Sequence, residues 1–429
     1  MKYPAKDSTH EVRLSNGLPV CVVNVVGSHT VTVMLLVKAG SLYDLPEKSG
    51  TAHFLEHMFF KGTKLYPSSN DLAMEIEMMG GFTNAFTSYE YTGYYIKVPR
   101  KNVLKAVQLL AQVITEPIFD EKEIQKEKGV IREEIRMYND LPSEIVKDEF
   151  NKTLFQDDPL GKSITGSSES IATIDRNVIK RYEEEYYHSN NMMLVVSGDV
   201  DMRRILGEIE TSFSKVREKK SISRRILFKP SLLRDTRIKH IAKDSEQAHI
   251  VIGGYAFPRN SEFEYPFKLG MNILTDGFGS KLFQSLRENL GIAYYVGGGV
   301  ATFSNVGKYI ISAGLASEKV EEGINAILMG MRELLDGNIE QKEFIRAKNY
   351  YIASLMEEFE TAEDQAGWYG LSFLFKKKYR KPEELTEKIE NIQLEDVIAS
   401  WQKLLSQNKP IITVLSKVLN KGIIENVIN

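Results

Sequence analysis

The predicted secondary-structure elements of this chain recur in the same order after about 220 residues, which is typical of an internal duplication. The start of a charged helix, residues 119–124 (FDEKEI), returns as residues 339–344 (IEQKEF). A strand at residues 194–197 (LVVS) returns at residues 413–416 (TVLS). Strands are mixed with runs of helices instead of alternating as strict βαβ units, which favours an α+β sandwich. We therefore predict an α+β fold with two structurally similar halves, each an antiparallel-rich sheet packed with helices.

The length of the chain agrees with two domains. At 429 residues it exceeds what one ordinary hydrophobic core holds. Residues 216–234 form a basic stretch that contains serine and proline and has no hydrophobic periodicity, which is typical of a linker. The predicted domains are therefore residues 1–215 and residues 235–429, joined by residues 216–234.

Composition limits which binding partners and which cellular compartment we expect for this protein. A formal net charge of -3 gives no indication of a nucleic-acid partner. The single cysteine, Cys21, excludes an intramolecular disulfide and indicates a reducing compartment. No uninterrupted apolar run approaches the ~20 residues of a membrane span, and residues 1–7 (MKYPAKD) lack the features of a signal or transit peptide. We expect a cytoplasmic protein without a membrane span.

Residues 50–60 (GTAHFLEHMFF) contain the candidate chemistry of the first half. His53, Glu56 and His57 stand at positions i, i+3 and i+4, so they share one face of a predicted helix. The rest of this helix is largely apolar, and burying the three polar groups is costly unless a divalent cation pairs them. Neutral imidazoles suit zinc, and the H-x-x-E-H order is the inverted zinc-protease signature. We predict His53 and His57 as zinc ligands and Glu56 as the general base.

The alternative interpretation is a pair of hydrogen-bonded core histidines that have this spacing by chance. A zinc site with two histidines also needs a third protein ligand from elsewhere in the fold. Glu127 and Glu134 are seven residues apart on a predicted helix, so they lie on one face, two turns from each other. A charged helical face is usually only a solvated face, so the spacing alone leaves their role open.

The second half lacks the two histidines and the glutamate at the place where the helix of residues 50–60 would recur. Residues 267–278 contain neither histidine nor glutamate. Arg287 and Tyr294 follow, seven residues apart with a glycine between them, so that both side chains could reach one carbonyl group. Gly277 and Gly279 do not fit a phosphate-binding Walker pattern, and the start of a helix is the better interpretation.

The sequence resembles the M16 zinc metallopeptidases, the family of pitrilysin, insulinase and the mitochondrial processing peptidase. The resemblance covers nearly the whole chain and rests on residues 53–57 (HFLEH), residues 127–134 (EKGVIREE) and residues 287–294. In this family the third zinc ligand is a glutamate well downstream of the motif, seven residues after another recurrent glutamate. The resemblance therefore implies Glu134 as the third ligand, with Glu133 as the alternative, and one zinc ion per chain.

The resemblance also implies an architecture and an activity. Two α+β halves would face each other across a chamber that is enclosed on dimerisation. Because the chain has both the zinc motif and the Arg287–Tyr294 element, it is similar to the homodimeric bacterial type. The implied activity is endopeptidase cleavage of small or unfolded peptides. Glu127 would orient a ligand or the water, Tyr294 would donate to the developing oxyanion, and Arg287 would hold a substrate carbonyl.

Two groups of residues are implied to bind the peptide. Phe82, Asn84 and Ala85 lie on a strand similar to the family's edge strand, to which an extended peptide adds as a further strand. Glu144 and Asp148 are four residues apart, so they share a face if residues 143–150 are helical. In the mitochondrial enzyme, acidic residues at this spacing recognise an arginine upstream of the cut, and carboxylates can pair bidentately with a guanidinium.

Two other functions stay open at this point. A catalytically silent subunit, like the core proteins of the respiratory bc1 complex, would have lost parts of the site, whereas this chain keeps residues 53–57 and Glu134. A peptide-binding module with a purely structural zinc would need a fourth protein ligand. No cysteine or spare histidine lies near the motif in the sequence to supply one.

Overall fold

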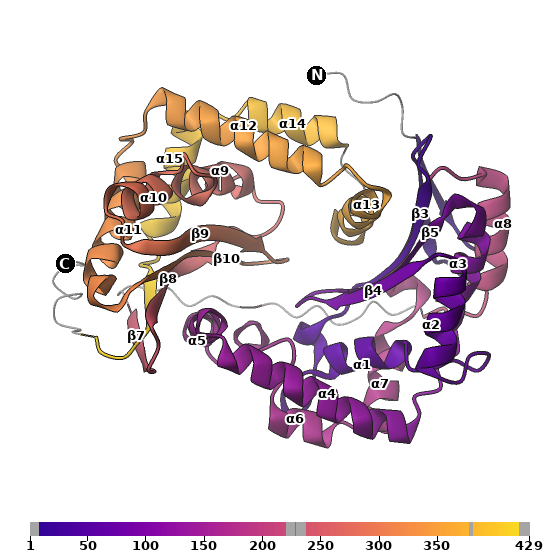
Figure 1. The fold of residues 1–429 in the computed structure, drawn as a ribbon. Coiled ribbons are helices and arrows are strands. Elements are labelled where there is room, and N and C mark those ends of the chain that lie inside the picture. Colours follow the sequence, from indigo (N-terminus) through magenta and orange to yellow (C-terminus); the bar gives the residue numbers. More distant parts are fainter. Residues whose placement is uncertain (1–7, 220–227, 229–236, 377–380, 420–429) are drawn as a thin grey trace. The chain divides into compact units, whose positions relative to one another are not determined.

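The computed structural model describes residues 8–219, 228, 237–376 and 381–419 (Figure 1). The chain forms two compact units. The first unit comprises residues 1–135, 163–226 and 357–381, and the second comprises residues 136–162, 227–356 and 382–429. Among the described residues, no helix combines the length and the apolar character that a membrane crossing needs.

The first unit is built on a six-stranded sheet with the order β1-β2-β6-β3-β5-β4. β2 and β6 are parallel, and all other neighbours are antiparallel. The strands are β1 (Ser8–Arg13), β2 (Pro19–Asn24), β3 (Thr30–Val37), β4 (Phe82–Thr87), β5 (Thr92–Pro99) and β6 (Met192–Gly198). The β-branched run predicted at residues 30–37 forms β3, near the middle of this sheet, where its side chains are buried on both faces.

The second unit repeats this arrangement in a five-stranded sheet with the order β7-β11-β8-β10-β9. These strands are β7 (Arg237–Ala242), β8 (Gln247–Ala256), β9 (Ala293–Thr302), β10 (Gly307–Ala316) and β11 (Ile411–Ser416). In this order they match β2, β3, β4, β5 and β6, and β7 and β11 form the corresponding parallel pair. The repeated order and directions confirm the predicted α+β fold with two similar, antiparallel-rich halves.

Helices cover both faces of each sheet. In the first unit they are α1 (Thr51–Phe59), α2 (Ser69–Met78), α3 (Val103–Thr115), α4 (Glu121–Asp140, whose last turn falls in the second unit), α6 (Ser168–Thr173), α7 (Arg176–Tyr186), α8 (Met202–Ser212) and α13 (Ala362–Lys376). In the second unit they are α5 (Pro142–Phe155), α9 (Glu264–Thr275), α10 (Lys281–Phe283), a π-helix (Gln284–Asn289), α11 (Val320–Leu335), α12 (Gln341–Glu357), α14 (Pro382–Glu390) and α15 (Leu394–Leu405).

The two faces of β3 illustrate how the first sheet is buried. Val33 and Leu35 belong to the large core that α1 and α3 also enter. Met34 and Leu36 point to the other face, where they pack with Ala366 and Tyr369 of α13. The strand is therefore apolar along its whole length because each face has its own helical cover.

The first unit includes one helix from the second half of the sequence, and the second unit includes one helix from the first half. α13 comes from the second half of the chain but lies beside β3 of the first unit (Figure 1). α5 comes from the first half but packs on β8 and β11 of the second unit, where the Tyr255 hydroxyl donates to the carbonyl oxygen of Leu154 at 2.9 Å. The compact units are thus not continuous halves. The predicted linker lies mostly outside the described residues, and the boundaries at residues 215 and 235 stay a prediction.

Candidate metal centre

Helix α1, which carries the motif at residues 53–57, begins at a position fixed by the residues around it. Gly50, just before the helix, has a φ of 92°, and a Cβ there would lie 2.7 Å from the carbonyl oxygen of Thr165. Only glycine fits this left-handed, crowded position. Asp44 accepts hydrogen bonds from the N–H groups of Gly50 at 2.7 Å and Ala52 at 2.9 Å. These bonds satisfy donors of the first turn and fix the direction of the polar face of α1.

α4 supplies two carboxylates to the same place. Asp120 accepts from the N–H groups of Lys122 at 2.9 Å and Glu123 at 3.2 Å, and so caps the start of the helix. Glu127 and Glu134 share a face of α4, as their spacing predicts, and both reach histidines of α1. Glu127 is buried and Glu134 is half-buried.

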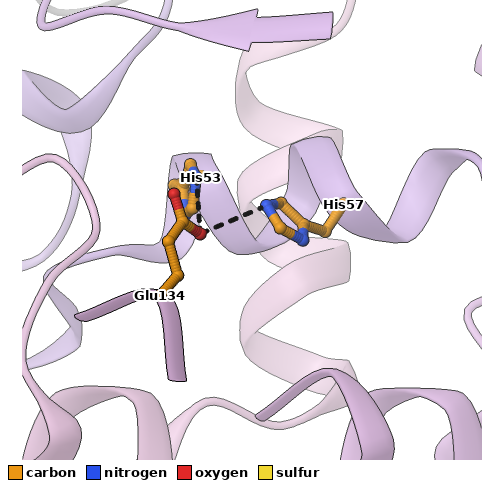
Figure 2. Close-up of side chains that lie close together, drawn as sticks. All are labelled: His53, His57 and Glu134. Carbon is orange, nitrogen blue, oxygen red and sulfur yellow. Dashed lines mark ion pairs between the residues drawn. The ribbon is translucent and has the colours of Figure 1, made fainter. Parts of the chain in front are cut away.

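Three candidate ligand atoms converge between α1 and α4 (Figure 2). Oε2 of Glu134 lies 3.6 Å from Nε2 of His53 and 3.8 Å from Nε2 of His57. All three ligand atoms lie within 4.8 Å of one another. In a tetrahedral zinc site with bonds of about 2.0–2.1 Å, ligand atoms stand roughly 3.4 Å apart. Small side-chain movements would therefore bring these atoms to zinc distance.

His57 is held in the tautomer that a metal ligand needs. Its Nδ1 lies 2.8 Å from Oε1 of Glu127, so the Nδ1 proton is donated to this carboxylate and the Nε2 lone pair is left for a metal. Burial opposes protonation of His57, but the hydrogen bond and charge of Glu127 outweigh it and raise its pKa. Burial likewise opposes ionisation of Glu127, but its hydrogen bonds to His57 and Lys61 lower its pKa.

His53 differs from His57, because its surroundings favour the neutral imidazole. Burial, together with the neighbouring His57, lowers its pKa to about 3. Its Nδ1 is buried and has no hydrogen-bond partner among the described residues. Burial also raises the pKa of Glu134. Two imidazoles whose Nε2 atoms face one carboxylate are a donor set that fits zinc and leaves a fourth position open.

Glu56 lies on the same face of α1 but outside this group of three. Its Oε2 accepts a hydrogen bond from Oγ1 of Thr87 at 2.5 Å. Burial raises the pKa of Glu56, and the Thr87 hydrogen bond partly offsets this effect. Because Thr87 is the last residue of β4, the candidate general base is tied directly to the edge of the sheet.

The residues predicted to bind a peptide lie on that edge. Among the described strands, β4 pairs only with β5, so its other side is available. Phe82 is 75% exposed, Asn84 is exposed and Ala85 is half-buried. The N–H of Ala85 donates to Oδ1 of Asn84 at 2.9 Å, so a side chain of the strand itself covers this edge donor.

Arg287 and Tyr294 lie together in the second unit. Arg287 belongs to the π-helix and Tyr294 to β9. Nη1 of Arg287 donates to the backbone carbonyl oxygen of Tyr294, and Tyr294 is 57% exposed. The structure therefore brings the two predicted substrate contacts of the second half side by side.

Glu144 and Asp148 also belong to the second unit, on α5. Residues 143–150 are helical, as the proposed shared face requires. Each carboxylate already has a lysine partner: Glu144 lies 2.7 Å from Lys147, and Asp148 lies 2.8 Å from Lys152. An arginine of a substrate would therefore compete with these partly exposed ion pairs, which are individually weak.

Comparison with known proteins identifies the family of this chain. The family model described as "Insulinase (Peptidase family M16)" matches residues 20–168, and the model described as "Peptidase M16 inactive domain" matches residues 173–351. A Rickettsia felis protein named an uncharacterized zinc protease is 33% identical over 402 residues, which is 94% of this chain and 96% of the relative. The chain belongs to peptidase family M16.

Other similar proteins match nearly the whole length of the chain. A Bacillus subtilis protein, also named an uncharacterized zinc protease, is 30% identical and spans 92% of this chain and 95% of its own. The solved structure of a protease from Helicobacter pylori has a TM-score of 0.88 at 21% identity, covering 96% of this chain and 99% of that one. A structure titled as a peptidase M16 inactive domain from Pseudomonas fluorescens has a TM-score of 0.87 at 20% identity, covering 96% and 98%. These structures show the same fold.

Three residues that support the M16 motif were not predicted from the sequence. Asp44 caps α1 from six residues before Gly50, which is too far for an ordinary N-cap signal. Thr87 reaches Glu56 across the fold, and no local pattern indicates this contact. Lys61 contacts Glu127, and its only signal is the four-residue spacing from His57.

Proposed function

We propose that this M16 chain is a zinc-dependent endopeptidase that cleaves small or unfolded peptides. The observation that carries the proposal is the convergence of His53, His57 and Glu134, with the separate carboxylate Glu56 on the same helical face. Three protein ligands leave one position for water or substrate, which is the arrangement of catalytic zinc sites. The names of the Rickettsia and Bacillus relatives support the same activity.

The residues of the chain have distinct roles in this proposal. Bound zinc would polarise the scissile carbonyl group and lower the pKa of a water molecule. Glu56 accepts the proton of the attacking water and passes it to the leaving amine nitrogen, so hydrolysis needs no covalent intermediate. Glu127 keeps the ring of His57 in one orientation and one tautomer through the bond to Nδ1.

The substrate would bind as an extended strand. A peptide that pairs with the exposed edge of β4, near Phe82, Asn84 and Ala85, is held mainly through main-chain hydrogen bonds. Asn84 would turn away from the N–H of Ala85 to release this donor. Such binding depends little on the substrate's side chains, which suits unfolded peptides. Tyr294 would donate to the developing oxyanion, and Arg287 would hold a substrate carbonyl.

Digestion of a peptide library tests this activity. The zinc-loaded protein is incubated with a mixture of short peptides and, separately, with a stable folded domain, and mass spectrometry identifies the products. We expect cleavage at internal bonds of the peptides, loss of cleavage after chelation, and resistance of the folded domain. Absence of any cleavage by the zinc-loaded protein would instead favour a catalytically silent subunit.

The same library tests whether Glu144 and Asp148 recognise arginine. We expect enrichment of arginine upstream of the cut, and the double variant Glu144→Gln, Asp148→Asn should lower kcat/KM for such peptides about tenfold, since a charge-assisted hydrogen bond contributes about 1.5 kcal/mol. Glu149→Gln is the matched control, because Glu149 lies on α5 and pairs with Lys152 but is outside the predicted contact. Cleavage sites without upstream arginine or lysine would refute the preference and leave the hydrolytic activity intact.

We further propose that the enzyme is a homodimer, as expected for a short M16 chain that carries both the zinc motif and the Arg287–Tyr294 element. Light scattering of the active protein should give twice the chain mass of 48.8 kDa. The activity should also fall on dilution below the dimer dissociation constant. A fully active species of single-chain mass would contradict the dimer.

A further inference from the structure

We propose that Lys61 is a positioning residue of the metal centre, which anchors the buried carboxylate of Glu127 and thereby fixes the ring of His57. This inference rests on the proposed zinc site. Nζ of Lys61 lies 2.7 Å from Oε2 of Glu127, while Oε1 of the same carboxylate lies 2.8 Å from Nδ1 of His57. The two oxygens of one carboxylate therefore join the lysine to the predicted ligand.

Glu127 needs such an anchor because its side chain is only 3% exposed. A buried carboxylate is costly unless both its charge and its lone pairs are paired. Among the described residues, Lys61 is the one Lys or Arg that forms an ion pair with it. Without this pair the carboxylate would be free to rotate or move toward solvent, and the Nδ1 of His57 would lose its acceptor.

The backbone holds Lys61 firmly enough for this role. Its N–H donates to the carbonyl oxygen of Met58 at 3.2 Å, in the turn that ends α1. The next residue, Gly62, has a φ of 143°, and a Cβ there would lie 2.6 Å from the carbonyl oxygen of Pro67. The chain therefore turns at a fixed place, and the lysine side chain, 28% exposed, leads back to Glu127.

Lys61 can affect zinc affinity in two opposite ways, and an experiment can separate them. Glu56, Glu127 and Glu134 place three carboxylates around a site for one divalent cation, which leaves one negative charge for Lys61 to balance. Direct repulsion between Lys61 and a bound cation weakens metal binding, so a purely electrostatic role predicts that removing the lysine tightens zinc binding. A positioning role predicts weaker binding, because loss of the outer contacts of a ligand typically costs about 10–100-fold in metal affinity.

Zinc affinity, measured by competition with a chromogenic chelator, decides between these effects. We expect Lys61→Met to weaken zinc binding by about 10–100-fold and Lys61→Arg to retain binding close to wild type. The control is Lys64→Met, because Lys64 lies three residues after Lys61, its side chain is 73% exposed, and its ion pair to Glu116 is long, at 3.9 Å. Unchanged or tighter binding by Lys61→Met would overturn the inference.

A double variant keeps the test decisive if Lys61→Met does not fold. Glu127→Gln removes the buried charge. Adding Lys61→Met to that variant therefore leaves no buried carboxylate without a partner, and the double variant should fold. We expect the double variant to bind zinc as Glu127→Gln alone does, because the lysine acts through Glu127; an additional loss of affinity would contradict this.

Wild type and Glu134→Gln are measured alongside. If wild type binds no zinc, or Glu134→Gln binds it unchanged, the proposed metal site fails and this inference with it. If those two behave as expected and Lys61→Met binds normally, only the role of Lys61 fails.

Discussion

Glu56→Gln is expected to lower peptide hydrolysis by about 10²–10⁴-fold, the usual contribution of a general base, while the zinc content stays near that of wild type. The amide has nearly the shape of the carboxylate but cannot accept the proton of the attacking water. Glu56 is not among the three converging ligand atoms, so its replacement leaves the metal-binding groups in place. Zinc analysis and a quenched-peptide assay on the same sample measure both quantities.

The surroundings of Glu56 favour a properly folded variant. Burial raises its pKa, so the protein favours the neutral form of this side chain more than water does. The Oγ1 of Thr87 can donate to the amide oxygen of glutamine as it donates to the carboxylate. A loss of activity can therefore be attributed to the missing base. Near-normal turnover by Glu56→Gln would show that another group takes the proton.

Glu134→Gln is expected to lower zinc affinity by more than about 100-fold, because loss of a ligand should exceed the usual effect of an outer contact. Oε2 of Glu134 faces both imidazoles, so the substitution removes the only negative charge among the three ligands. Glu133→Gln is the control, since Glu133 is the adjacent, exposed residue of α4. If Glu133→Gln lost zinc and Glu134→Gln kept it, the ligand assignment would be wrong.

The sequence allowed prediction of those features that depend on local spacing. The i, i+3, i+4 pattern of residues 53–57 is sufficient to place two histidines and Glu56 on one face, and the seven-residue spacing of Glu127 and Glu134 is sufficient to place both on one side of α4. The choice of Glu134 over Glu133 came from the resemblance to M16 peptidases. The helical register supports this choice, because Glu133 is exposed while Glu134 faces α1.

Contacts between residues that are far apart in the sequence could not be predicted from it. An apolar face shows that a helix will be covered but does not show which sheet will cover it. The packing of α5 on the second sheet and of α13 on the first was therefore not predicted. For the same reason the partners of Lys61 and Thr87 emerged only from the structure. The predicted arginine contacts Glu144 and Asp148 were placed on a helix correctly, but their lysine partners were not foreseen.

Titration of the metal-free protein with Zn²⁺, with hydrolysis of a quenched peptide as the readout, tests the central claim most directly. We predict no hydrolysis after chelation, a rise in rate that ends at one zinc ion per chain, and no such rise at these concentrations for Glu134→Gln. Full hydrolysis by the metal-free protein, or none by the wild-type protein at saturating zinc, would contradict the assignment of His53, His57 and Glu134 as a catalytic zinc site.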